Sequence, residues 1–427
     1  MMLVLRSSHT LSQANLGHRV ISASATSRQA TLAPTFSRHF SSGTTLRSNA
    51  ARTSQNQQVP YLTTDDEVEQ FSTPRITVVG VGGAGGNAVN HMMERNLNGV
   101  SFLSANTDAQ SLARSKAPVR IQLGKGATGG LGAGSKPVVG RAAAEESLEE
   151  VIRQLEKCHM VFLTAGMGGG TGTGAAPVIA EAVREKGILT VGIVTTPFAF
   201  EGKMRGRVAE EGIADLERAV DTLIVIPNQK LLLLTPGEQK TTWQGSFKMV
   251  DNVLHDGIKS VTDLVVIPGQ INLDFADVTT IMRGGGRALI GTGEAEGRGR
   301  AKIAASMALH NPLLDDMSIK GAKGVLINVY GGSDLGLNEV DEIVSVVQES
   351  VDQDANIIFG TTNDDAYDGK VKVSLIVTGM DKKRRNYEAS IPPRKKEAEV
   401  TVEASETTAG ALDDLKKAFH KIKKNWW

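Results

Sequence analysis

The chain has 427 residues and equal numbers of basic and acidic side chains, 47 of each, so its formal net charge is zero. This length allows two globular domains, and the balanced charge gives no reason to expect a nucleic-acid partner. The single cysteine, Cys158, excludes an internal disulfide and a cysteine-bound metal cluster. No segment has the length and apolar content of a membrane span.

The first 64 residues differ in composition from the rest. They contain no lysine and no acidic residue, and they are rich in serine and threonine. Their positive charges come from Arg6, Arg19, Arg28, Arg38, Arg47 and Arg52. An arginine-rich, acid-poor leader is typical of an organelle transit peptide. We therefore expect residues 1–64 to be a disordered transit peptide and residues 65–74 a linker. A merely disordered tail is the alternative.

The folded part begins with a short β-branched strand at 76–79, a glycine-rich turn at 80–86 and a helix at 87–94. Apolar runs and amphipathic stretches then alternate along the chain. The expected strands are 99–108, 159–166, 187–197 and 221–228, and the expected helices are 141–158 and 204–220. This alternation predicts an α/β fold with a parallel sheet covered on both faces.

A second, smaller set of elements follows. Apolar residues at helical spacing predict one long helix over 247–266, which would leave the sheet. Strands are expected at 324–332, 356–362 and 372–380, and a helix at 339–351. From Asp381 onward the chain is charged and rich in threonine and alanine, which is the composition of a linker.

Three glycine-rich turns are candidate phosphate sites. Gly80, Gly82 and Gly85 form a GxGxxG pattern between a strand and a helix, which alone would fit an NAD(P)-dependent oxidoreductase of the Rossmann type. The acidic residue that this fingerprint needs about 20 positions on is missing, because Asp108 lies further away. A second turn at 168–174 also joins a strand to a helix, and a third lies at 130–134. Three turns favour a phosphate chain held from several sides.

The second turn lies in MGGGTGTGAAPVIAEAV, residues 167–183, and lacks the lysine of the common GxxxxGK[ST] phosphate loop. Helix N-termini present unpaired N–H groups and a positive dipole end, and glycines allow close backbone approach. Thr171 and Thr173 add hydroxyl donors. We expect a di- or triphosphate site in which Mg²⁺, bound mainly through the phosphates, supplies the positive charge. A purely structural turn is the alternative.

GGGTGTG resembles the signature of the tubulin and FtsZ GTPases. The motifs GVGGAGGNAVN, NTDAQ, GLGAG, PFAFEG, IPN and NLDFADV are similar to the FtsZ branch in order and spacing, from about Arg75 to Met380. The resemblance implies a Rossmann-like GTP-binding domain at 75–245, a central helix at 246–270 and a smaller α+β domain at 271–381. It also implies GTP hydrolysis in head-to-tail filaments of the chain itself, which would form a division ring.

The resemblance further implies the residues that bind GTP or GDP. They are Gly82, Gly83, Ala84, Gly85, Gly86, Asn87, Asn106, Asp108, Gly132, Ala133, Gly134, Gly168, Gly169, Gly170, Thr171, Gly172, Thr173, Gly174, Pro197, Glu201, Arg205, Asn228, Phe247 and Asp251. The stretches GLGAGSKPVVGRAAAEE and SIKGAKGVLINVYGG are more similar to the α-proteobacterial type than to the cyanobacterial type. This favours a mitochondrial division protein of the matrix, associated with the inner membrane, over a plastid one of the stroma.

Some of these positions have a plainer interpretation. Glu201 and Arg205 are four apart and would form an ordinary ion pair on a helix, whereas the resemblance makes them ribose contacts. Asp251 would accept hydrogen bonds from N1–H and the 2-amino group of guanine, which adenine cannot offer, or would simply favour a helix start. Asn228 matches a base-edge contact, but Gln229 stands where the family usually has aspartate.

The segment NLDFADV, 272–278, carries the expected catalytic residues Asn272, Asp274 and Asp277. Taken alone, Asp274 and Asp277 form a helix cap and a first-turn acid. The glycine turns supply no carboxylate near a γ-phosphate, however, and the resemblance implies that a second subunit provides one from this loop. The aspartates would polarise the attacking water or hold the cation near it, with Asn272 orienting them. A non-polymerising regulator with a degenerate site is the alternative.

The chain ends in LDDLKKAFHKIKKNWW. A flexible linker is expected at 382–409. Residues 410–427 then place apolar side chains on one helical face, namely Leu412, Leu415, Phe419, Ile422 and Trp426. Lysines lie largely off this stripe. The pattern is typical of a helix that binds a membrane surface, and equally of one that docks on an adaptor protein or folds back on the core.

Overall fold

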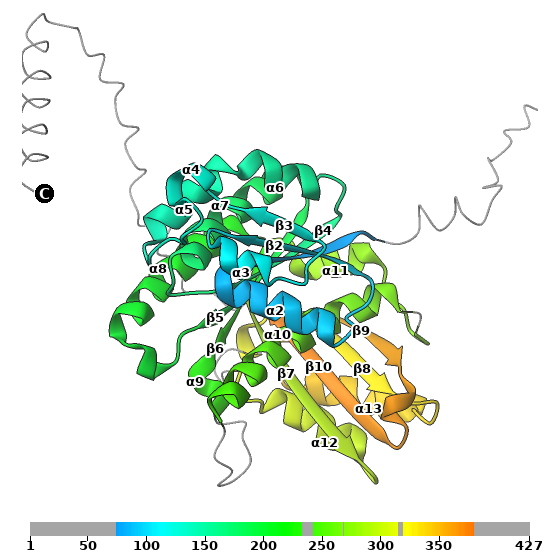
Figure 1. Cartoon of the computed structure of the whole chain (residues 1–427). Helices are drawn as coiled ribbons and strands as arrows, with labels where there is room; N and C mark the ends of the chain where they lie inside the picture. The colour runs from blue at the N-terminus through cyan, green and yellow to red at the C-terminus, as the bar shows by residue number, and fades with distance from the viewer. Residues whose placement is uncertain (1–73, 233–241, 268, 315–318, 380–427) are drawn as a thin grey trace, which may run out of the picture. The chain divides into compact units, whose positions relative to one another are not determined.

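The computed structural model describes residues 74–232, 242–267, 269–314 and 319–379 (Figure 1). The expected transit peptide, most of the linker at 65–74, the linker at 382–409 and the tail at 410–427 lie outside these residues. Within the described ranges, no helix combines the length and the apolar content needed to cross a membrane.

The N-terminal half is built on a parallel sheet, as the alternating pattern predicted. Its strands are β1 (Ile76–Val81), β2 (Val100–Asn106), β3 (Val119–Gln122), β4 (Met160–Gly166), β5 (Leu189–Thr196) and β6 (Thr222–Pro227). They lie in the order β3-β2-β1-β4-β5-β6, and every pair among them is parallel. Residues of β1 and β4 are almost entirely buried, because helices cover both faces of the sheet.

Two groups of helices cover the two faces. The first group is α2 (Gly82–Glu94), α10 (Trp243–Val266) and α11 (Phe275–Met282), whose apolar side chains share one buried cluster with the sheet. The second is α5 (Pro137–Glu146), α6 (Leu148–Leu155), α7 (Thr171–Glu185) and α8 (Lys203–Ala219), which share another cluster. The short helices α3 (Ala109–Ala113), α4 (Lys125–Thr128) and α9 (Asn228–Leu231) and the 3₁₀ turn η1 (Ala199–Glu201) lie in connections.

Two predicted helix boundaries were wrong. The single helix expected at 141–158 is divided into α5 and α6 at Ser147, whose φ of −107° and ψ of 8° are not helical. The Ser147 hydroxyl accepts a hydrogen bond from Gly124 N at 3.0 Å, which ties this break to the turn before α4. The first helix begins at Gly82 and not at 87, so most of the expected glycine turn is the first part of α2.

The C-terminal strands extend the same sheet to ten strands. They are β7 (Gly286–Glu296), β8 (Gly324–Gly331), β9 (Asn356–Asn363) and β10 (Lys370–Thr378), in the order β6-β7-β10-β8-β9. β7 is parallel to β6 over a short stretch, and β10 is antiparallel to both β7 and β8. The helices α12 (Arg300–Leu309) and α13 (Leu337–Gln348) share a third apolar cluster with these strands. The 3₁₀ turns η3 (Ile319–Gly321) and η4 (Asp365–Tyr367) complete this half.

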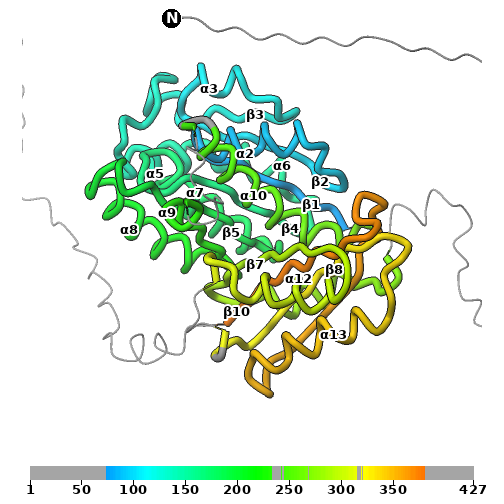
Figure 2. Tube along the Cα trace, turned by 90° about the horizontal axis from the view of Figure 1, so that it is seen from below, coloured from blue at the N-terminus to red at the C-terminus, as the bar shows by residue number. Residues whose placement is uncertain are grey.

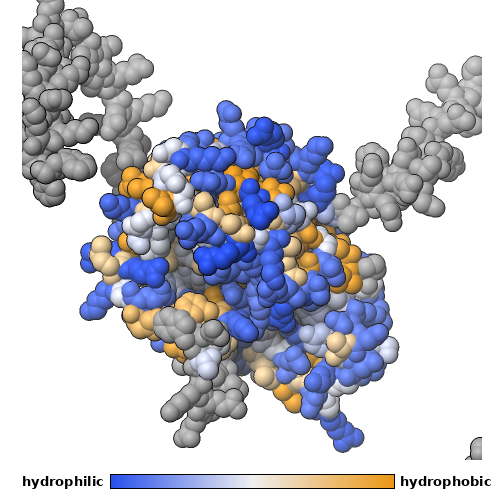
Figure 3. Space-filling model, in the orientation of Figure 1, coloured by the Kyte–Doolittle hydropathy of each residue, from blue (hydrophilic) through white to orange (hydrophobic). Residues whose placement is uncertain are grey.

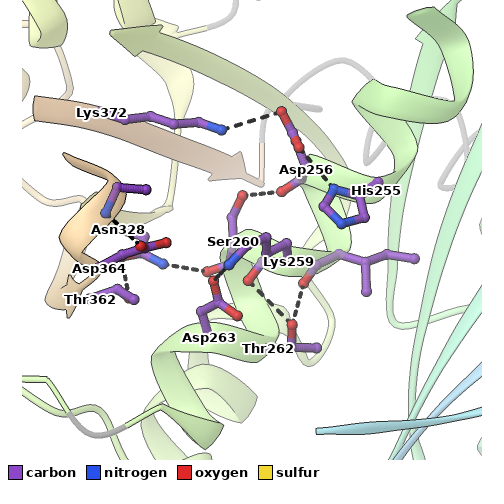
Figure 4. A network of polar contacts seen from close by, with 12 residues as sticks. His255, Asp256, Lys259, Ser260, Thr262, Asp263, Asn328, Thr362, Asp364 and Lys372 are labelled. Atoms are coloured by element: carbon purple, nitrogen blue, oxygen red, sulfur yellow. Dashed lines mark hydrogen bonds and ion pairs between the residues drawn. The ribbon is translucent and has the colours of Figure 1, made fainter. Parts of the chain in front are cut away.

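The long helix α10 lies between the two halves, as Figures 1 and 2 show. Its apolar side faces the N-terminal sheet through Leu254, Ile258 and Val261. Its other side carries polar groups towards the C-terminal strands, and Figure 4 shows this network. There the Asn328 side chain donates to Ser260 O at 3.0 Å and accepts a hydrogen bond from the Thr362 hydroxyl at 3.0 Å. The helix is therefore joined to both halves by specific contacts.

Candidate nucleotide site

A cavity of about 750 Å³ opens at the carboxyl ends of β1, β4, β5 and β6. This is the edge where ligands bind in parallel α/β sheets, and the volume suits a nucleotide-sized ligand. Many of the residues predicted from the sequence line it: Gly83, Ala84, Asn87, Gly169, Gly170, Thr171, Gly172, Pro197, Glu201, Arg205, Asn228, Phe247 and Asp251. The structure thus brings together motifs that are more than 160 residues apart in the sequence.

The first two glycine turns meet at this cavity. Gly82 has a φ of 73°, and a Cβ at this position would lie 2.9 Å from the backbone nitrogen of Gly172. A Cβ at Gly85 would lie 2.4 Å from the carbonyl oxygen of Thr164. Only glycine allows such approach, and it brings the first turns of α2 and α7 to one place. Two helix N-termini lining one cavity form an anion site without a lysine.

The remaining predicted binding residues do not line the cavity. They are Gly82, Gly85, Gly86, Asn106, Asp108, Gly132, Ala133, Gly134, Gly168, Thr173 and Gly174. Several have structural contacts behind the lining. A Cβ on Gly170 would lie 2.8 Å from the Ala133 Cβ, so the third glycine turn packs directly against the second. Asp108 caps α3 by accepting hydrogen bonds from Gln110 N and Ser111 N.

The two threonines of the second turn differ in their surroundings. The Thr171 hydroxyl lies at the cavity, 2.7 Å from the Thr107 hydroxyl. Thr173 is buried, and its hydroxyl accepts a hydrogen bond from Gly168 N at 2.9 Å. Thr173 therefore closes the turn on itself, whereas the sequence led us to expect it among the donors that face the phosphates.

Aromatic and polar groups form the other end of the cavity. The rings of Phe198 and Phe200 are stacked at 5.0 Å, and Phe247 meets Phe198 edge-on at 5.7 Å. Phe200 and Phe247 line the cavity. The Oδ1 atom of Asn228 and the hydroxyl of Thr164 are buried there without a hydrogen-bond partner. Buried polar atoms normally have partners, so this end has the apolar wall and free polar groups that a heterocyclic base requires.

Asp251 lies at the same end, on α10. Burial raises the pKa of its carboxyl to about 6, the positive charge of His91 opposes this, and Glu94 adds to it. Burial makes the ionised form of this carboxyl unfavourable. Hydrogen bonds from two donor groups of a ligand would stabilise that ionised form. Gln229, which departs from the family pattern, is an exposed side chain whose Oε1 accepts a hydrogen bond from Ala199 N at 3.2 Å. It thereby joins α9 to η1.

Glu201 and Arg205 form the i,i+4 ion pair expected from their spacing, with 2.5 Å between Oε2 and Nη1. The Glu201 carboxylate also accepts a hydrogen bond from Phe198 N at 2.9 Å. Both side chains line the cavity, and Arg205 is the single basic side chain among the described lining residues. Glu201 and Arg205 thus form the ordinary helix ion pair and are also placed to contact a ligand in the cavity.

The predicted catalytic residues lie at the opposite edge of the sheet. Asp274 caps α11 and accepts a hydrogen bond from Asp277 N at 2.7 Å, so the cap interpretation of these acids is correct. The ring of Phe275 lies 6.1 Å from that of His159, directly before β4, and Arg283 donates to Gly187 O, before β5. His159 and Gly187 therefore mark the amino ends of β4 and β5, whereas the cavity opens at the carboxyl ends of the same strands. The length of β4 separates the two by roughly 20 Å.

The sequence reasoning missed several lining residues. They are Val81, Thr164, Ala165, Gly166, Met167, Thr195, Thr196, Phe200, Val250 and Leu254. A usable signal existed, because residues at the carboxyl ends of predicted parallel strands must face this edge. Among the described residues, no group of three or more histidine, cysteine, aspartate and glutamate side chains is placed to hold a metal ion.

Comparison with known families supports the motif-based interpretation. The family model for the Tubulin/FtsZ family, GTPase domain, matches residues 75–235, and that for the FtsZ family, C-terminal domain, matches residues 286–381. The chain belongs to the tubulin/FtsZ family. This is a family of GTPases, so the chain is assigned to that enzyme class, with GTP and GDP as the nucleotides of the GTPase domain. The oxidoreductase alternative is excluded.

Individual relatives match over most of the described chain. The cell division protein FtsZ of Wolbachia sp. is 56% identical over 329 residues, 74% of this chain and 82% of that protein. The mitochondrial division protein fszA of Dictyostelium discoideum is 51% identical over 338 residues, 79% of this chain and 65% of that protein. In three further bacterial FtsZ relatives the match spans 54%, 52% and 60% of their length.

A solved structure shows the same fold. The empty FtsZ dimer of M. jannaschii aligns with a TM-score of 0.70 and 46% sequence identity, covering 74% of this chain and 91% of that chain. The tubulin/FtsZ fold predicted from the sequence motifs is therefore confirmed.

Proposed function

We propose that copies of this chain stack head to tail and hydrolyse GTP at each junction, where the pocket of one copy meets the acidic loop of the next. The observation that carries this proposal is the position of Asp274 and Asp277. They lie at the amino edge of the parallel sheet, whereas the cavity opens at its carboxyl edge. A rigid chain cannot bring these acids to its own nucleotide, but a second copy stacked on the cavity can.

Each end of the nucleotide has a proposed set of contacts. The first turns of α2 and α7 hold the phosphates through backbone N–H groups, and Thr171 adds a hydroxyl. Glu201 and Arg205 contact the ribose. Asp251 accepts from the guanine edge and Asn228 uses its free Oδ1 there. Mg²⁺ bound to the phosphates would supply positive charge that the lysine-free glycine turns lack.

The second copy supplies the groups that act on water. Its Asp274 and Asp277 polarise a water molecule, whose oxygen attacks the γ-phosphorus while the bond to the β–γ bridging oxygen breaks. Asn272 orients this loop. Most of the rate would come from positioning and from electrostatic stabilisation of the in-line transfer.

The surface around the pocket supports such a junction. Hydrophilic residues predominate on the face shown in Figure 3, and hydrophobic ones form separate patches. Leu131, Val138 and Met204, which are 90%, 79% and 70% exposed, come from the third glycine turn, α5 and α8. All three elements pack against the second glycine turn, so these apolar side chains would lie near a copy that covers the cavity. The M. jannaschii relative was solved as a dimer.

A complementation experiment tests this function. Asp277→Ala keeps the pocket and loses the loop acid. Gly169→Asp places a negative charge among the phosphate donors, and a Cβ at this position would meet no atom within 4 Å. Each variant alone should lack GTPase activity, and an equimolar mixture should recover part of it. A mixture that stays inactive, although both variants are folded and Asp277→Ala binds GTP, would contradict hydrolysis at a junction.

We further propose that the filament acts in mitochondria, as part of a division ring. Two observations support this address: the arginine-rich, acid-free leader and the Dictyostelium relative named as a mitochondrial division protein. The sequence RHFSS at 38–42 resembles cleavage contexts of the matrix protease, so we expect a mature N-terminus between Phe40 and Ala50. N-terminal sequencing of the protein from mitochondria measures this, and an intact Met1 would contradict both cleavage and address.

The basic amphipathic pattern at 410–427 supports a role in holding the filament at a membrane, directly or through an adaptor protein. Each lysine near an anionic surface would add about 1 kcal/mol. Flotation with anionic liposomes should separate the two routes, by comparing the mature chain with one that ends at Gly410. If the two proteins float equally, or if salt does not weaken flotation, the tail does not bind the membrane directly. Attachment through an adaptor protein would then be the remaining explanation.

A further inference from the structure

The C-terminal end of α2 is hydrogen-bonded to α10, close to the end of the cavity that Phe247 and Asp251 line, which we call the base end. The Oδ1 atom of Asn252 accepts hydrogen bonds from His91 Nε2 at 2.8 Å and from Arg95 Nη1 at 3.0 Å. Asn252 is half-buried, and it directly follows Asp251, which lines the cavity. One turn further along α10, Arg95 Nη1 also lies 3.8 Å from Asp256 Oδ1. A single oxygen of α10 thus receives two donors from one helix.

The two helices joined here carry the two ends of the nucleotide site. α2 begins at the first glycine turn, where the phosphates are expected, and α10 carries Asp251, which faces the base. The contact between them therefore sets the distance from the phosphate end of the cavity to the base end. A nucleotide can span only a limited range of lengths, so an error in this distance moves the carboxylate off the guanine edge.

We propose that Asn252 is a positioning residue for guanine recognition, which holds the Asp251 carboxylate in register with the phosphate-binding turn through His91 and Arg95. This proposal rests on the proposed contact between Asp251 and guanine. His91 serves both parts of it, because it holds Asn252 and its charge acts on the Asp251 carboxyl.

A general role in helix packing is the competing explanation, and the chain offers a matched control. Asn90 precedes His91 on α2, and its Oδ1 accepts hydrogen bonds from Lys116 N at 2.7 Å and from the Ser115 hydroxyl at 3.5 Å. It has the same side chain as Asn252 and lies on the same helix as His91, but its partners lie in the loop before β3 and not on α10. Asn90→Ala should therefore cost stability without altering base recognition.

The experiment measures the dissociation constants of GDP and of inosine diphosphate, which lacks the 2-amino group. For Asn252→Ala we expect GDP binding to weaken roughly tenfold, and the preference for GDP over inosine diphosphate to shrink, because one or two hydrogen bonds to Asp251 are lost. His91→Ala should act in the same direction, and His91→Gln, which keeps a donor, should restore most of the preference. Asn90→Ala should keep the preference.

Two outcomes would overturn different claims. If Asn252→Ala and Asn90→Ala show the same preference for GDP over inosine diphosphate, Asn252 has no positioning role. Asp251→Asn is measured alongside: if it too keeps the preference for GDP, the proposed base contact is itself wrong. A changed preference in Asp251→Asn with none in Asn252→Ala would remove only the positioning role. Thermal unfolding of each variant shows that the comparison is made between folded proteins.

Discussion

The carboxylate of Asp256 on α10 lies 3.3 Å from the ammonium group of Lys372 on β10, so one ion pair joins the central helix to the C-terminal strands (Figure 4). Burial alone would raise the pKa of Asp256, but the hydrogen bond to His255 and the charge of Lys372 outweigh it and lower the pKa to about 2. Arg95 reaches the same carboxylate from α2. Asp256 therefore links the helix that begins at the phosphate site to the other half of the molecule.

Lys372→Met should destabilise the protein by about 1–3 kcal/mol, because it leaves a half-buried carboxylate without its main cation. Urea unfolding at neutral pH measures this. Since the Asp256 pKa is depressed in the folded state, the stabilisation is present above the unfolded value near 4 and is lost as the pH falls through about 2. The difference between wild type and variant should shrink over that range. A difference that stays constant down to pH 2 would disprove the assignment.

Asp251→Asn should have opposite effects on stability and binding. The raised pKa means that the ionised carboxyl is unfavourable in the nucleotide-free fold at neutral pH. The neutral amide should therefore raise Tm without nucleotide by roughly 2–4 °C. It should weaken GDP binding roughly tenfold to a hundredfold, because an amide cannot accept both guanine donors. Calorimetry without GDP measures the rise in Tm, and calorimetry with GDP measures the loss of binding. A Tm below that of wild type without nucleotide would refute the argument.

GDP affinity should depend on pH through the same group. In the proposed guanine contact the bound state needs the Asp251 carboxylate, whereas the free protein takes up a proton below a pKa of about 6. Affinity should be constant above about pH 7 and fall towards tenfold per pH unit below about pH 6. Fluorescence anisotropy with a labelled GDP between pH 5 and 8 would follow this. In Asp251→Asn the dependence should be weaker, and the part that remains belongs to the terminal phosphate of GDP, whose second pKa is also about 6.

Two glycines of the first turn should respond differently to alanine. A Cβ at Gly85 would lie 2.4 Å from Thr164 O, which is backbone, whereas a Cβ at Gly83 meets no atom within 4 Å. Gly85→Ala should therefore cost about 2–4 kcal/mol of stability, in the range for overpacked sites. Gly83→Ala should be nearly neutral for folding. Similar unfolding midpoints for the two variants would show that β4 and α2 do not approach as closely as the structure has them.

Asp277→Ala should bind GTP nearly as well as wild type, hydrolyse none and leave long-lived polymers, because the residue lies at the far edge of the sheet from the pocket. In the wild type, GTPase activity should rise faster than linearly with protein concentration, since each active site at the proposed junction needs two copies. Steady-state phosphate release across a dilution series measures this. Activity strictly proportional to protein at high dilution would point to a site complete in one chain.

The sequence was sufficient for five of the six strands of the parallel sheet and for the glycine turns of the pocket, because long apolar runs and glycine turns depend on local rules. It did not reveal the short edge strand β3, and it did not reveal β7. Gly291 and Gly293 interrupt this strand, and glycine within an apolar run usually indicates a turn. The structure gives another reason for them, since a Cβ at either position would lie within 2.3 Å of a carbonyl oxygen of α12. Only the position of α12 explains these glycines, and a single sequence does not contain it.

Lining residues of the cavity could be predicted where they lie at the carboxyl end of a predicted strand. Thr195 and Thr196 could have been expected beside Pro197, whereas Val250 and Leu254 line the cavity only because of the rotation of α10 about its axis. Likewise, the sequence did not indicate that Thr173 would turn inward or that His91 and Arg95 would hold Asn252. Such contacts depend on how two helices pack, which is fixed by the whole core. The domain limits at 75–245, 246–270 and 271–381 stay a prediction.

The separation of the pocket from the acidic loop by the depth of the sheet has a consequence for the proposed head-to-tail stack. One terminal copy always shows a pocket that no loop faces, and the other always shows a loop with no nucleotide opposite it. The two tips are therefore chemically unlike, and the stack is polar. The fraction of nucleotides that can be cleaved also rises with the number of copies in the row. A turnover rate per molecule would thus report how long the rows are.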